Sequence, residues 1–279
     1  MAAENNAQDL RPVYPPAGHA MTLLAIELEQ LATGEMRGWM PVTPHTASSD
    51  GMPRLATVAM LVDALGGMRS ITASDPEWAF TADMSLHLLP AGPMEMLQAD
   101  LHVRRRGRRT LVIEAELLAD GARPAGAALL TFAVVPRPQH LVNITIDMTP
   151  GRRMMNPNAA QEKLTMNYFE ELNISALEPG LVTIELRPVV ANTVGALHGA
   201  LHAAIIEEAA ASLGRELLDR NVATTDMHLS YLELGRFGPL SAKATSVGGP
   251  ADGRLSAIVE VRDGNGVLVS YATTEVTGL

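Results

Sequence analysis

The feature that most constrains the fold of this chain is an internal repeat. Residues 81–89 read TADMSLHLL and residues 224–232 read TTDMHLSYL, an offset of 143 residues. A long apolar segment precedes each copy, at 51–68 and at 195–215, and these two segments superpose at an offset of 144. Self-similarity at a fixed spacing indicates that one structural unit occurs twice. The 279 residues are enough for two domains of ordinary size.

Each half predicts a strand, a long helix and then four strands joined by tight turns. Beyond the TxDM strand, the strand-like runs are 94–106, 108–119 and 124–135 in the first half, and 239–247, 253–262 and 266–277 in the second. Turn sequences such as Asp120-Gly121 and Asp252-Gly253 separate these runs, and consecutive hairpins imply antiparallel pairing. The helical segments are apolar on nearly every face, so we expect each helix to be buried with a sheet wrapped around it. The sequence predicts an α+β fold.

The join between the two halves is predicted near residues 136–163. Prolines and asparagines interrupt any periodicity in this stretch. We therefore place an N-terminal tail at 1–19, a first domain at 20–149 and a second domain at 150–279.

Composition and charge exclude several classes of function. The net charge is -10, and an acidic protein repels a phosphate backbone, so we expect no nucleic-acid partner. The absence of cysteine excludes disulfides, thiol catalysis and cysteine-ligated zinc. The polar, acidic N-terminus does not resemble a secretory signal, and no apolar stretch of about 18 residues is free of charge. We expect a cytoplasmic protein with no membrane span.

Gly199 lies at the predicted start of the second helix. Without a side chain it lets a ligand approach its backbone N–H, which is unpaired at a helix start and lies at the positive end of the helix dipole. Such an N–H can polarise a carbonyl and stabilise an oxyanion. The alternative is that Gly199 is a packing position, with Asn192 and Thr193 as helix caps.

Asp63 and Glu207 are carboxylates in apolar surroundings. The residues three and four positions from Asp63 are Ala59, Met60, Gly66 and Gly67, and none of them can pair with it. A lone buried carboxylate is costly and its pKa should rise, which suits a general base or a nucleophile. The alternative is a helix face that meets water at a cleft, and the presence of Glu208 beside Glu207 favours that alternative in the second half.

This pattern resembles hotdog acyl-CoA thioesterases of the phenylacetate-pathway and thioesterase-superfamily type. In that family an Asn precedes the His-Gly-Gly at the helix start by six residues, an acid follows the first Gly by eight, and a Ser or Thr follows the acid by eighteen. The residues that keep these spacings are Asn192, His198, Gly199, Glu207 and Thr225, with Ala200 in place of the second glycine.

The resemblance implies a double hotdog: two repeats, each an antiparallel sheet wrapped around a long central helix. It also implies hydrolysis of an acyl thioester to a carboxylic acid and CoA, with coenzyme A as part of the substrate and no cofactor. In the family the Gly N–H and the Asn bind the thioester carbonyl, the acid activates water or attacks directly, and the hydroxyl orients the water.

The first half departs from the family pattern. The residues at the positions of Asn192, His198 and Gly199 are Ser48, Arg54 and Leu55. Asp63 keeps the acid, and Thr81 keeps the eighteen-residue spacing, although the strand alignment pairs Ala82 with Thr225. The first half therefore has an acid without a good oxyanion hole.

Geometry predicts that each site uses both halves. Gly199 and Glu207 are eight residues apart on one helix, or about 12 Å, which is too far for that acid to act on a carbonyl held at Gly199. An antiparallel partner helix would bring Asp63 opposite Gly199, and the family likewise assembles its site across a subunit pair. One site would contain Asn192, Gly199, Asp63 and Thr81, and the other Ser48, Leu55, Glu207 and Thr225. We predict that the first site is the working one.

Five arginines surround the turn at Gly107. Arg105, Arg106 and Arg108 could hold the phosphates of CoA, and an exposed basic turn in an acidic protein is the alternative. The pair His198 and His202 has no acid set to complete a metal site, so no metal is expected.

Two other functions stay open at this point. One is a hotdog hydratase or dehydratase acting on acyl thioesters, with His198 as the proton carrier. The other is a non-catalytic protein that binds acyl-CoA, because a fold does not settle an activity. In each case we expect a small-molecule acyl-CoA partner and a homo-oligomer of the chain.

Overall fold

The computed structural model describes residues 14–141, 146–156 and 164–279. In the first half the elements are β1 (Glu27–Gln30), β2 (Met36–Pro41), α1 (Leu55–Ser74), β3 (Trp78–Leu88), β4 (Met96–Arg106), β5 (Thr110–Ala119) and β6 (Arg123–Val135). They are followed by β7 (Gly151–Met154), α2 (Tyr168–Glu171), β8 (Ser175–Glu178), β9 (Leu181–Ile184), α3 (Gly199–Leu218), β10 (Val222–Tyr231), β11 (Leu240–Ser246), β12 (Arg254–Arg262) and β13 (Leu268–Gly278).

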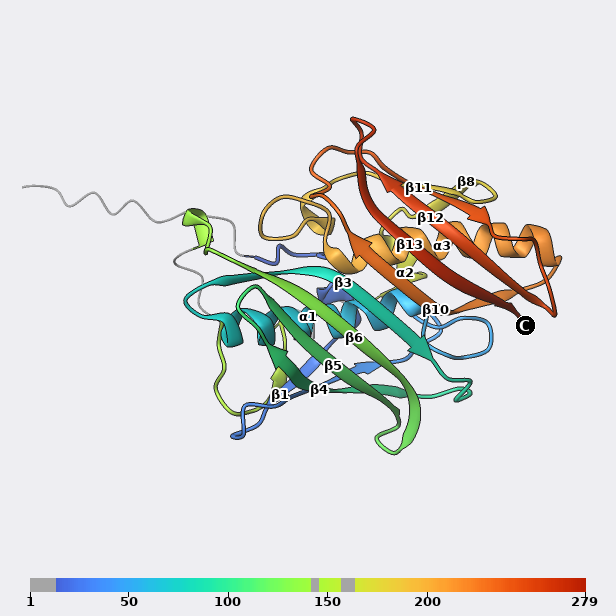
Figure 1. Cartoon of the computed structure of the whole chain (residues 1–279). Helices are drawn as coiled ribbons and strands as arrows, with labels where there is room; N and C mark the ends of the chain where they lie inside the picture. The colour runs from blue at the N-terminus through green and yellow to red at the C-terminus, as the bar shows by residue number, and fades with distance from the viewer. Residues whose placement is uncertain (1–13, 142–145, 157–163) are drawn as a thin grey trace, which may run out of the picture.

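The described strands form one antiparallel sheet of 13 strands, with β3 paired to β10 at its centre (Figure 1). Outward from β3 the order is β6, β5, β4, β2, β1, and outward from β10 it is β13, β12, β11, β9, β8. The same arrangement therefore occurs on both sides of the β3–β10 pair. β7 is the exception, because it extends the sheet beyond β1. Residues 151–154 thus pair with the first half although they follow the predicted boundary, and the domain limits stay a prediction.

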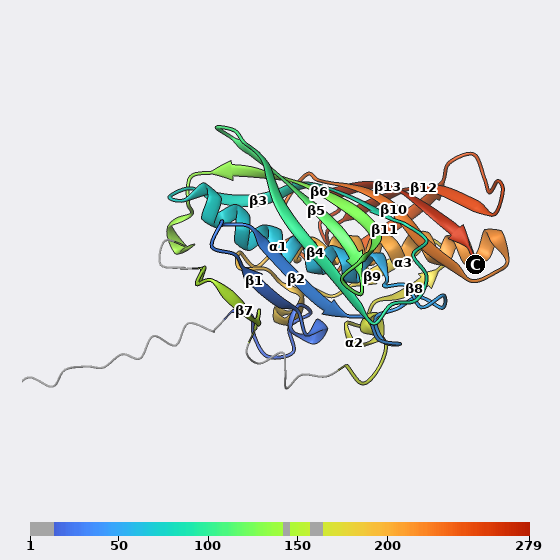
Figure 2. The ribbon, with the colours of Figure 1, turned by 90° about the horizontal axis from the view of Figure 1, so that it is seen from below.

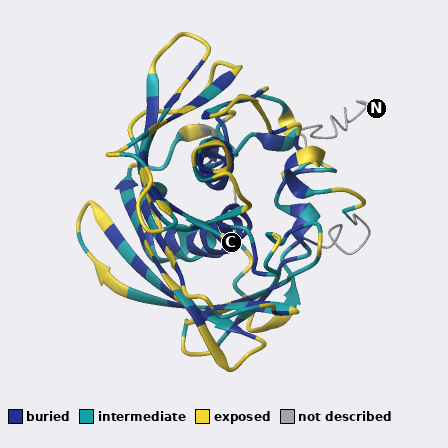
Figure 3. Ribbon diagram, turned by 90° about the vertical axis from the view of Figure 1, so that its right-hand side faces the viewer, coloured by how far each residue is buried: buried dark blue, intermediate teal, exposed yellow. Residues whose placement is uncertain are grey.

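The two 20-residue helices lie against the inner face of the curved sheet (Figure 2). α1 packs on β2 to β6, α3 packs on β8 to β13, and the helices contact each other. Figure 3 shows buried residues concentrated on the helices and buried bands that interrupt the exposed ones along the strands. On β5 the alternate residues Leu111, Ile113, Ala115 and Leu117 have no exposed surface, as the period of two in a half-buried strand requires. The predicted α+β fold with buried central helices is confirmed.

α1 is apolar because it is enclosed by protein. Among the described residues it is the one helix whose length and composition would let it cross a membrane, yet 72% of that window is buried inside the fold. The helix ends at Ser74, just before Asp75 and Pro76, where a proline disfavours helical geometry in the preceding residue. Burial therefore accounts for its composition.

The loops that lead into α1 and α3 have the same backbone design. Ser48 N–H donates to the Met52 carbonyl at 2.8 Å, and Asn192 N–H donates to the Ala196 carbonyl at 2.7 Å. The residue before each helix is extended, with φ -63° and ψ 140° before α1 and φ -60° and ψ 138° before α3. Equivalent positions in the two halves are thus placed alike, 144 residues apart.

Candidate active site

Each helix carries an acid that reaches the N-terminus of the other helix. The Asp63 carboxylate on α1 accepts a hydrogen bond from the N–H of Ala200 on α3. Glu207 Oε2 on α3 accepts from the N–H of Ala56 on α1 at 2.7 Å. This crossed pattern shows that α1 and α3 run antiparallel, and it brings Asp63 opposite the start of α3. Each candidate site therefore draws residues from both halves of the chain.

Asp63 is enclosed by groups that lie close to both of its oxygens. Thr81 Oγ1 donates to Asp63 Oδ1 at 2.8 Å. The second oxygen, Oδ2, lies 2.7 Å from the point that a Cβ on Gly199 would occupy, and the Asp63 side chain is only 7% exposed. A side chain at position 199 would collide with the carboxylate, so glycine is required here by the close approach of the acid.

Burial raises the pKa of Asp63 from 3.8 to about 6, and the hydrogen bonds from Thr81 and Ala200 limit the rise. Desolvation favours the neutral carboxyl, whereas donors to the carboxylate favour the charged form. At neutral pH the group is therefore mostly ionised and can accept a proton, with a basicity well above that of an exposed aspartate.

His198 caps α3 and is electrically neutral. Its Nδ1 accepts a hydrogen bond from the N–H of Ala200 at 3.3 Å, and burial lowers its pKa to about 4. Nδ1 also lies 3.6 Å from Asp63 Oδ2, but both atoms are then acceptors, so this contact is no ion pair at neutral pH. The cap of α3 is His198 rather than Asn192, which corrects the alternative in which Asn192 caps the helix.

Asn192 is held in one orientation by the loop before α3. Its Oδ1 accepts from the N–H groups of Val194 at 3.0 Å and of Ala196 at 3.1 Å. The N–H of Gly199 has no hydrogen-bond partner in the described part of the chain. An unpaired N–H at a helix start can bind a carbonyl oxygen or an oxyanion.

Two tyrosines that the sequence did not single out lie near Asp63. Tyr231 donates its O–H to the Gly199 carbonyl at 2.9 Å, and Tyr14 packs edge-on against His19, with ring centres 5.3 Å apart. Burial, and then the charge of Asp63, raise the pKa of both phenols. The one available signal was that Tyr231 replaces Leu88 in the repeat.

The described part of the predicted N-terminal tail packs on the second half. His19 Nε2 lies 3.0 Å from the Ala191 carbonyl oxygen, and the His19 ring makes an edge contact with His198 at 5.8 Å between ring centres. Residues 14–19 therefore cover the start of α3, close to Asp63.

The second acid, Glu207, is held by a cation. Arg54 Nε lies 3.2 Å from Glu207 Oε1 and Arg54 Nη2 lies 2.8 Å from Glu208 Oε2. The Arg54 guanidinium also stacks 3.5 Å from the centre of the Phe169 ring. Burial raises the pKa of Glu207, whereas Arg54 and the Ala56 N–H oppose the rise. Glu207 therefore lies beside Leu55 and an arginine, whereas Asp63 lies beside Gly199 and a neutral histidine.

The strand register shows that Thr224, and not Thr225, is the counterpart of Thr81. β3 is irregular between Thr81 and Asp83, and β10 is irregular between Thr224 and Asp226. Thr225 is therefore the bulged residue of β10, and no hydrogen bond joins it to Glu207 among the described residues. Counting eighteen residues from the acid missed this shift of one.

The arginine turn between β4 and β5 lies at the C-terminal end of α1. Arg106 donates to the Ala73 carbonyl and pairs with Glu77, and Arg104 pairs with Glu114. Arg105 and Arg108 are exposed and have no ion pair within the described ranges. The turn is about 16 Å along α1 from Asp63, at 1.5 Å per residue. A CoA-binding role of Arg105, Arg106 and Arg108 stays a prediction.

No three His, Asp or Glu side chains are close enough to hold a metal ion in the part of the chain that the structure describes. His202 Nδ1 lies 2.9 Å from Ser270 Oγ, and burial lowers the pKa of His202 to about 3. This buried histidine is neutral and bonded within the core.

No protein-family model and no curated protein sequence matches the chain. Similar solved structures include an acyl-ACP thioesterase from Bacteroides thetaiotaomicron, with a TM-score of 0.58 and 12% identity over 86% of this chain and 96% of that one. The 12:0-ACP thioesterase from Umbellularia californica has a TM-score of 0.58 and 10% identity over 87% and 94%. The tesB protein of Mycobacterium avium subs paratuberculosis has a TM-score of 0.54 and 12% identity over 87% and 93%.

At this identity the likeness shows the fold alone. The chain has the hotdog-type fold of these thioesterases over most of its length, which confirms that part of the predicted fold.

Proposed function

We propose that the chain is a double hotdog that hydrolyses acyl-CoA to a carboxylic acid and free CoA at the Asp63–Gly199 site. The observation that carries the proposal is a buried carboxylate of raised pKa, pressed against the glycine that begins a helix. This arrangement places a base and an oxyanion donor side by side, as thioester hydrolysis requires.

The chemistry follows from the different surroundings of the two Asp63 oxygens. Thr81 occupies Oδ1, so Oδ2, which faces Gly199, is the oxygen available for reaction. The thioester carbonyl oxygen would accept from the Gly199 N–H, with the Asn192 amide as a second donor. A water molecule would give its proton to Asp63 as its oxygen bonds to the carbonyl carbon. The C–S bond then breaks, and the departing thiolate takes the proton from Asp63.

A direct attack by Asp63 on the carbonyl is the other route to the same products. In that route Oδ2 bonds to the carbonyl carbon, the thiolate leaves, and water then cleaves the mixed anhydride. Both routes need an ionised Asp63 and the same oxyanion donor, so the site assignment does not depend on the choice between them.

The state of His198 disfavours the hydratase alternative. A hydratase needs a histidine that exchanges a proton with the carbon chain, whereas His198 uses Nδ1 as a helix cap and has a pKa of about 4. The Glu207 side is proposed to be inactive, because Arg54 pairs with the acid and Leu55 stands in place of the glycine. Arg105 and Arg108 are proposed to bind the CoA phosphates.

The test is thiol release from a panel of acyl-CoAs of different length, measured with and without a chelator. We expect turnover that the chelator leaves unchanged and that Asp63→Asn abolishes. Hydration of enoyl-CoA without thiol release would support the hydratase alternative. Binding without either reaction would make the chain an acyl-CoA-binding protein. The cytoplasmic location and the homo-oligomer stay predictions.

A further inference from the structure

Tyr231 is the last residue of β10, and its phenol lies beside the groups that are proposed to react. The phenol oxygen Oη lies 3.5 Å from the point that a Cβ on Gly199 would occupy, and Asp63 Oδ2 lies 2.7 Å from the same point. Because both distances run from one point, the two oxygens are at most about two hydrogen-bond lengths apart. One water molecule can span that separation.

The phenol of Tyr231 is held in place and keeps its proton. Oη donates to the Gly199 carbonyl at 2.9 Å, and the ring packs edge-on against His202 with ring centres 5.5 Å apart. Burial, and then the charge of Asp63, raise the pKa of the phenol, so it stays neutral at pH values where Asp63 is ionised. The hydrogen of the phenol is used in the bond to Gly199, which leaves the oxygen able to accept.

A water molecule that attacks a carbonyl carbon has to be oriented through both of its hydrogens. One hydrogen goes to the base, and a second acceptor directs the other, so that a lone pair of the water points at the carbon. The family resemblance gives this second task to the threonine hydroxyl. Thr81 is poorly placed for it, because its hydroxyl donates to Asp63 Oδ1, and Oδ2 is the oxygen that faces Gly199.

Two other acceptors lie near Asp63 Oδ2, and they differ in what they already bind. His198 Nδ1 lies 3.6 Å from Oδ2, but its one lone pair accepts from the N–H of Ala200. No donor to Tyr231 Oη occurs among the described residues, so the lone pairs of this oxygen are free. A water molecule bound to Oδ2 therefore has Oη as its second acceptor.

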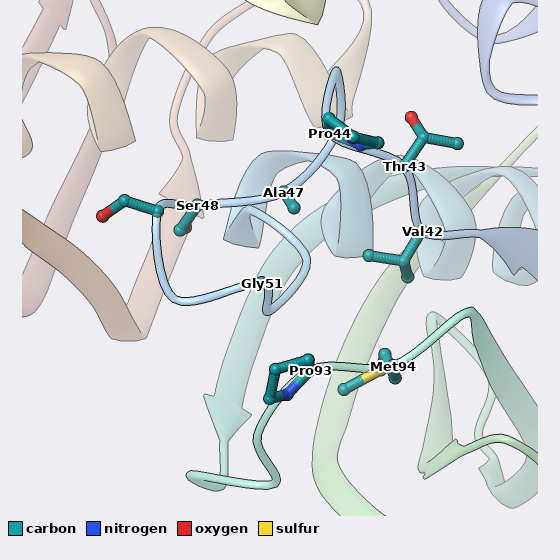
Figure 4. Close-up of a pocket in the computed structure, with 9 residues that line it drawn as sticks. Val42, Thr43, Pro44, Ala47, Ser48, Gly51, Pro93 and Met94 are labelled. Carbon is teal, nitrogen blue, oxygen red and sulfur yellow. The ribbon is translucent and has the colours of Figure 1, made fainter.

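The first half has a leucine at the position equivalent to Tyr231. This residue is Leu88, the last residue of β3. In that half, the loop before α1 and the loop after β3 border a groove of about 500 Å³, with Pro93 and Met94 on one side and Gly51 on the other (Figure 4). The residues that line the groove are all uncharged, so they offer no base to a water molecule. The tyrosine thus occurs on the side of the fold where the acid has no cation partner.

We propose that Tyr231 orients the attacking water at the Asp63–Gly199 site, by accepting the hydrogen that Asp63 does not take. This inference rests on the proposed thioesterase function and specifies the water route instead of direct attack by Asp63. As the water oxygen bonds to the carbonyl carbon, one proton passes to Asp63 Oδ2 and the other stays on that oxygen, which becomes part of the carboxylic acid. The C–S bond then breaks, and the thiolate takes the proton from Asp63. Tyr231 keeps its own proton throughout.

The test is Tyr231→Phe in the full chain, assayed for acyl-CoA hydrolysis with and without hydroxylamine. The substitution removes Oη and keeps the ring against His202. We expect kcat for hydrolysis to fall about 10- to 100-fold and KM to stay within about twofold, because the water loses its orientation while the substrate contacts remain. Hydroxylamine attacks without a base, so hydroxamate formation should persist. The ratio of hydroxamate to acid should then rise about tenfold or more.

Tyr168→Phe is the matched control, because Tyr168 has no exposed surface and its phenol also donates to a backbone carbonyl, that of Ala20, at 3.2 Å. It should lower the melting temperature and leave both kcat and the product ratio at their parent values. A single turnover of the parent in water that carries heavy oxygen provides a second measurement. We expect the label in the released acid and none in the Asp63 side chain.

Unchanged hydrolysis in Tyr231→Phe would overturn the inference and leave the proposed function standing. Equal losses of hydrolysis and of hydroxamate formation would also overturn it, since they would show that the phenol only supports Gly199. Heavy oxygen in the Asp63 side chain would show direct attack, which contradicts an oriented water. A parent that releases no thiol from any acyl-CoA would refute the proposed function, and the inference with it.

Discussion

Asp63→Asn should inactivate the protein and stabilise it at the same time. The carboxyl is buried and its pKa is raised from 3.8 to about 6. Folding therefore opposes its ionisation, and the fold loses stability as the pH rises through this interval. One pKa unit corresponds to about 1.4 kcal/mol, so the ionised acid costs about 3 kcal/mol at pH values above 6. Asparagine has the same shape and cannot ionise.

The assay is urea unfolding of the parent and Asp63→Asn at about pH 8 and about pH 4. We expect the variant to be more stable by up to about 3 kcal/mol at the higher pH, and the difference to fall below about 1 kcal/mol at the lower pH, where the carboxyl of the folded parent is neutral. Thiol release should fall by about 10²–10⁴-fold, which is the usual loss when a general base is removed.

Glu207→Gln provides the opposite case. Glu207 is bound to Arg54 and to the Ala56 N–H, so its removal leaves a buried guanidinium with a weaker partner. We expect a loss of about 3 kcal/mol of stability with a substantial part of the activity retained. A destabilised Asp63→Asn that keeps its activity would refute the reasoning, and so would an inactive Glu207→Gln that is folded. Full activity in both variants would exclude both acids.

Three further results are expected. The ratio kcat/KM should rise with pH around a midpoint near 6, because Asp63 must be ionised, and a flat profile from pH 4 to 8 would contradict its role as base. Gly199→Ala should lower kcat by more than about 100-fold, since the new Cβ would lie 2.7 Å from Asp63 Oδ2. A variant that keeps its activity would show that Gly199 is not part of the active site. Neutralising Arg105 and Arg108 should raise KM with little change in kcat. An unchanged KM would show that these arginines do not bind the substrate.

The fold was predictable because its determinants are local and repeated. The apolar helices, the TxDM strands and the turns at Asp120-Gly121 and Asp252-Gly253 each indicate one type of element. The short strands β1, β7 and β8 were not predicted, since four residues carry too little periodicity to identify a strand. The pairing of β7 with β1 is a long-range contact that no local pattern encodes.

The proximity of Asp63 and Gly199 could be predicted from the sequence, because eight residues of helical rise separate Gly199 from Glu207 and an antiparallel partner helix brings Asp63 opposite Gly199. The roles of Arg54, Tyr231 and Tyr14 could not. In the sequence, Arg54 was identified only as a residue that departs from the family motif. Its ion pair with Glu207 joins side chains from the two halves of the chain, which no local pattern indicates. Thr225 was one residue off because the repeat offset is 144 residues in the helices and 143 in the strands that follow, so the acid-to-threonine distance is one residue shorter in the second half.

Because the two halves belong to one chain, the two sites can differ in sequence. In a pair of identical subunits, a change near one helix start would appear at both, so an arginine that disabled one acid would disable the other. Within a single chain, Arg54 and His198 occupy matching places and differ. One acid can then stay free of a cation while the other is bound to an arginine, and a single substitution can alter either side alone.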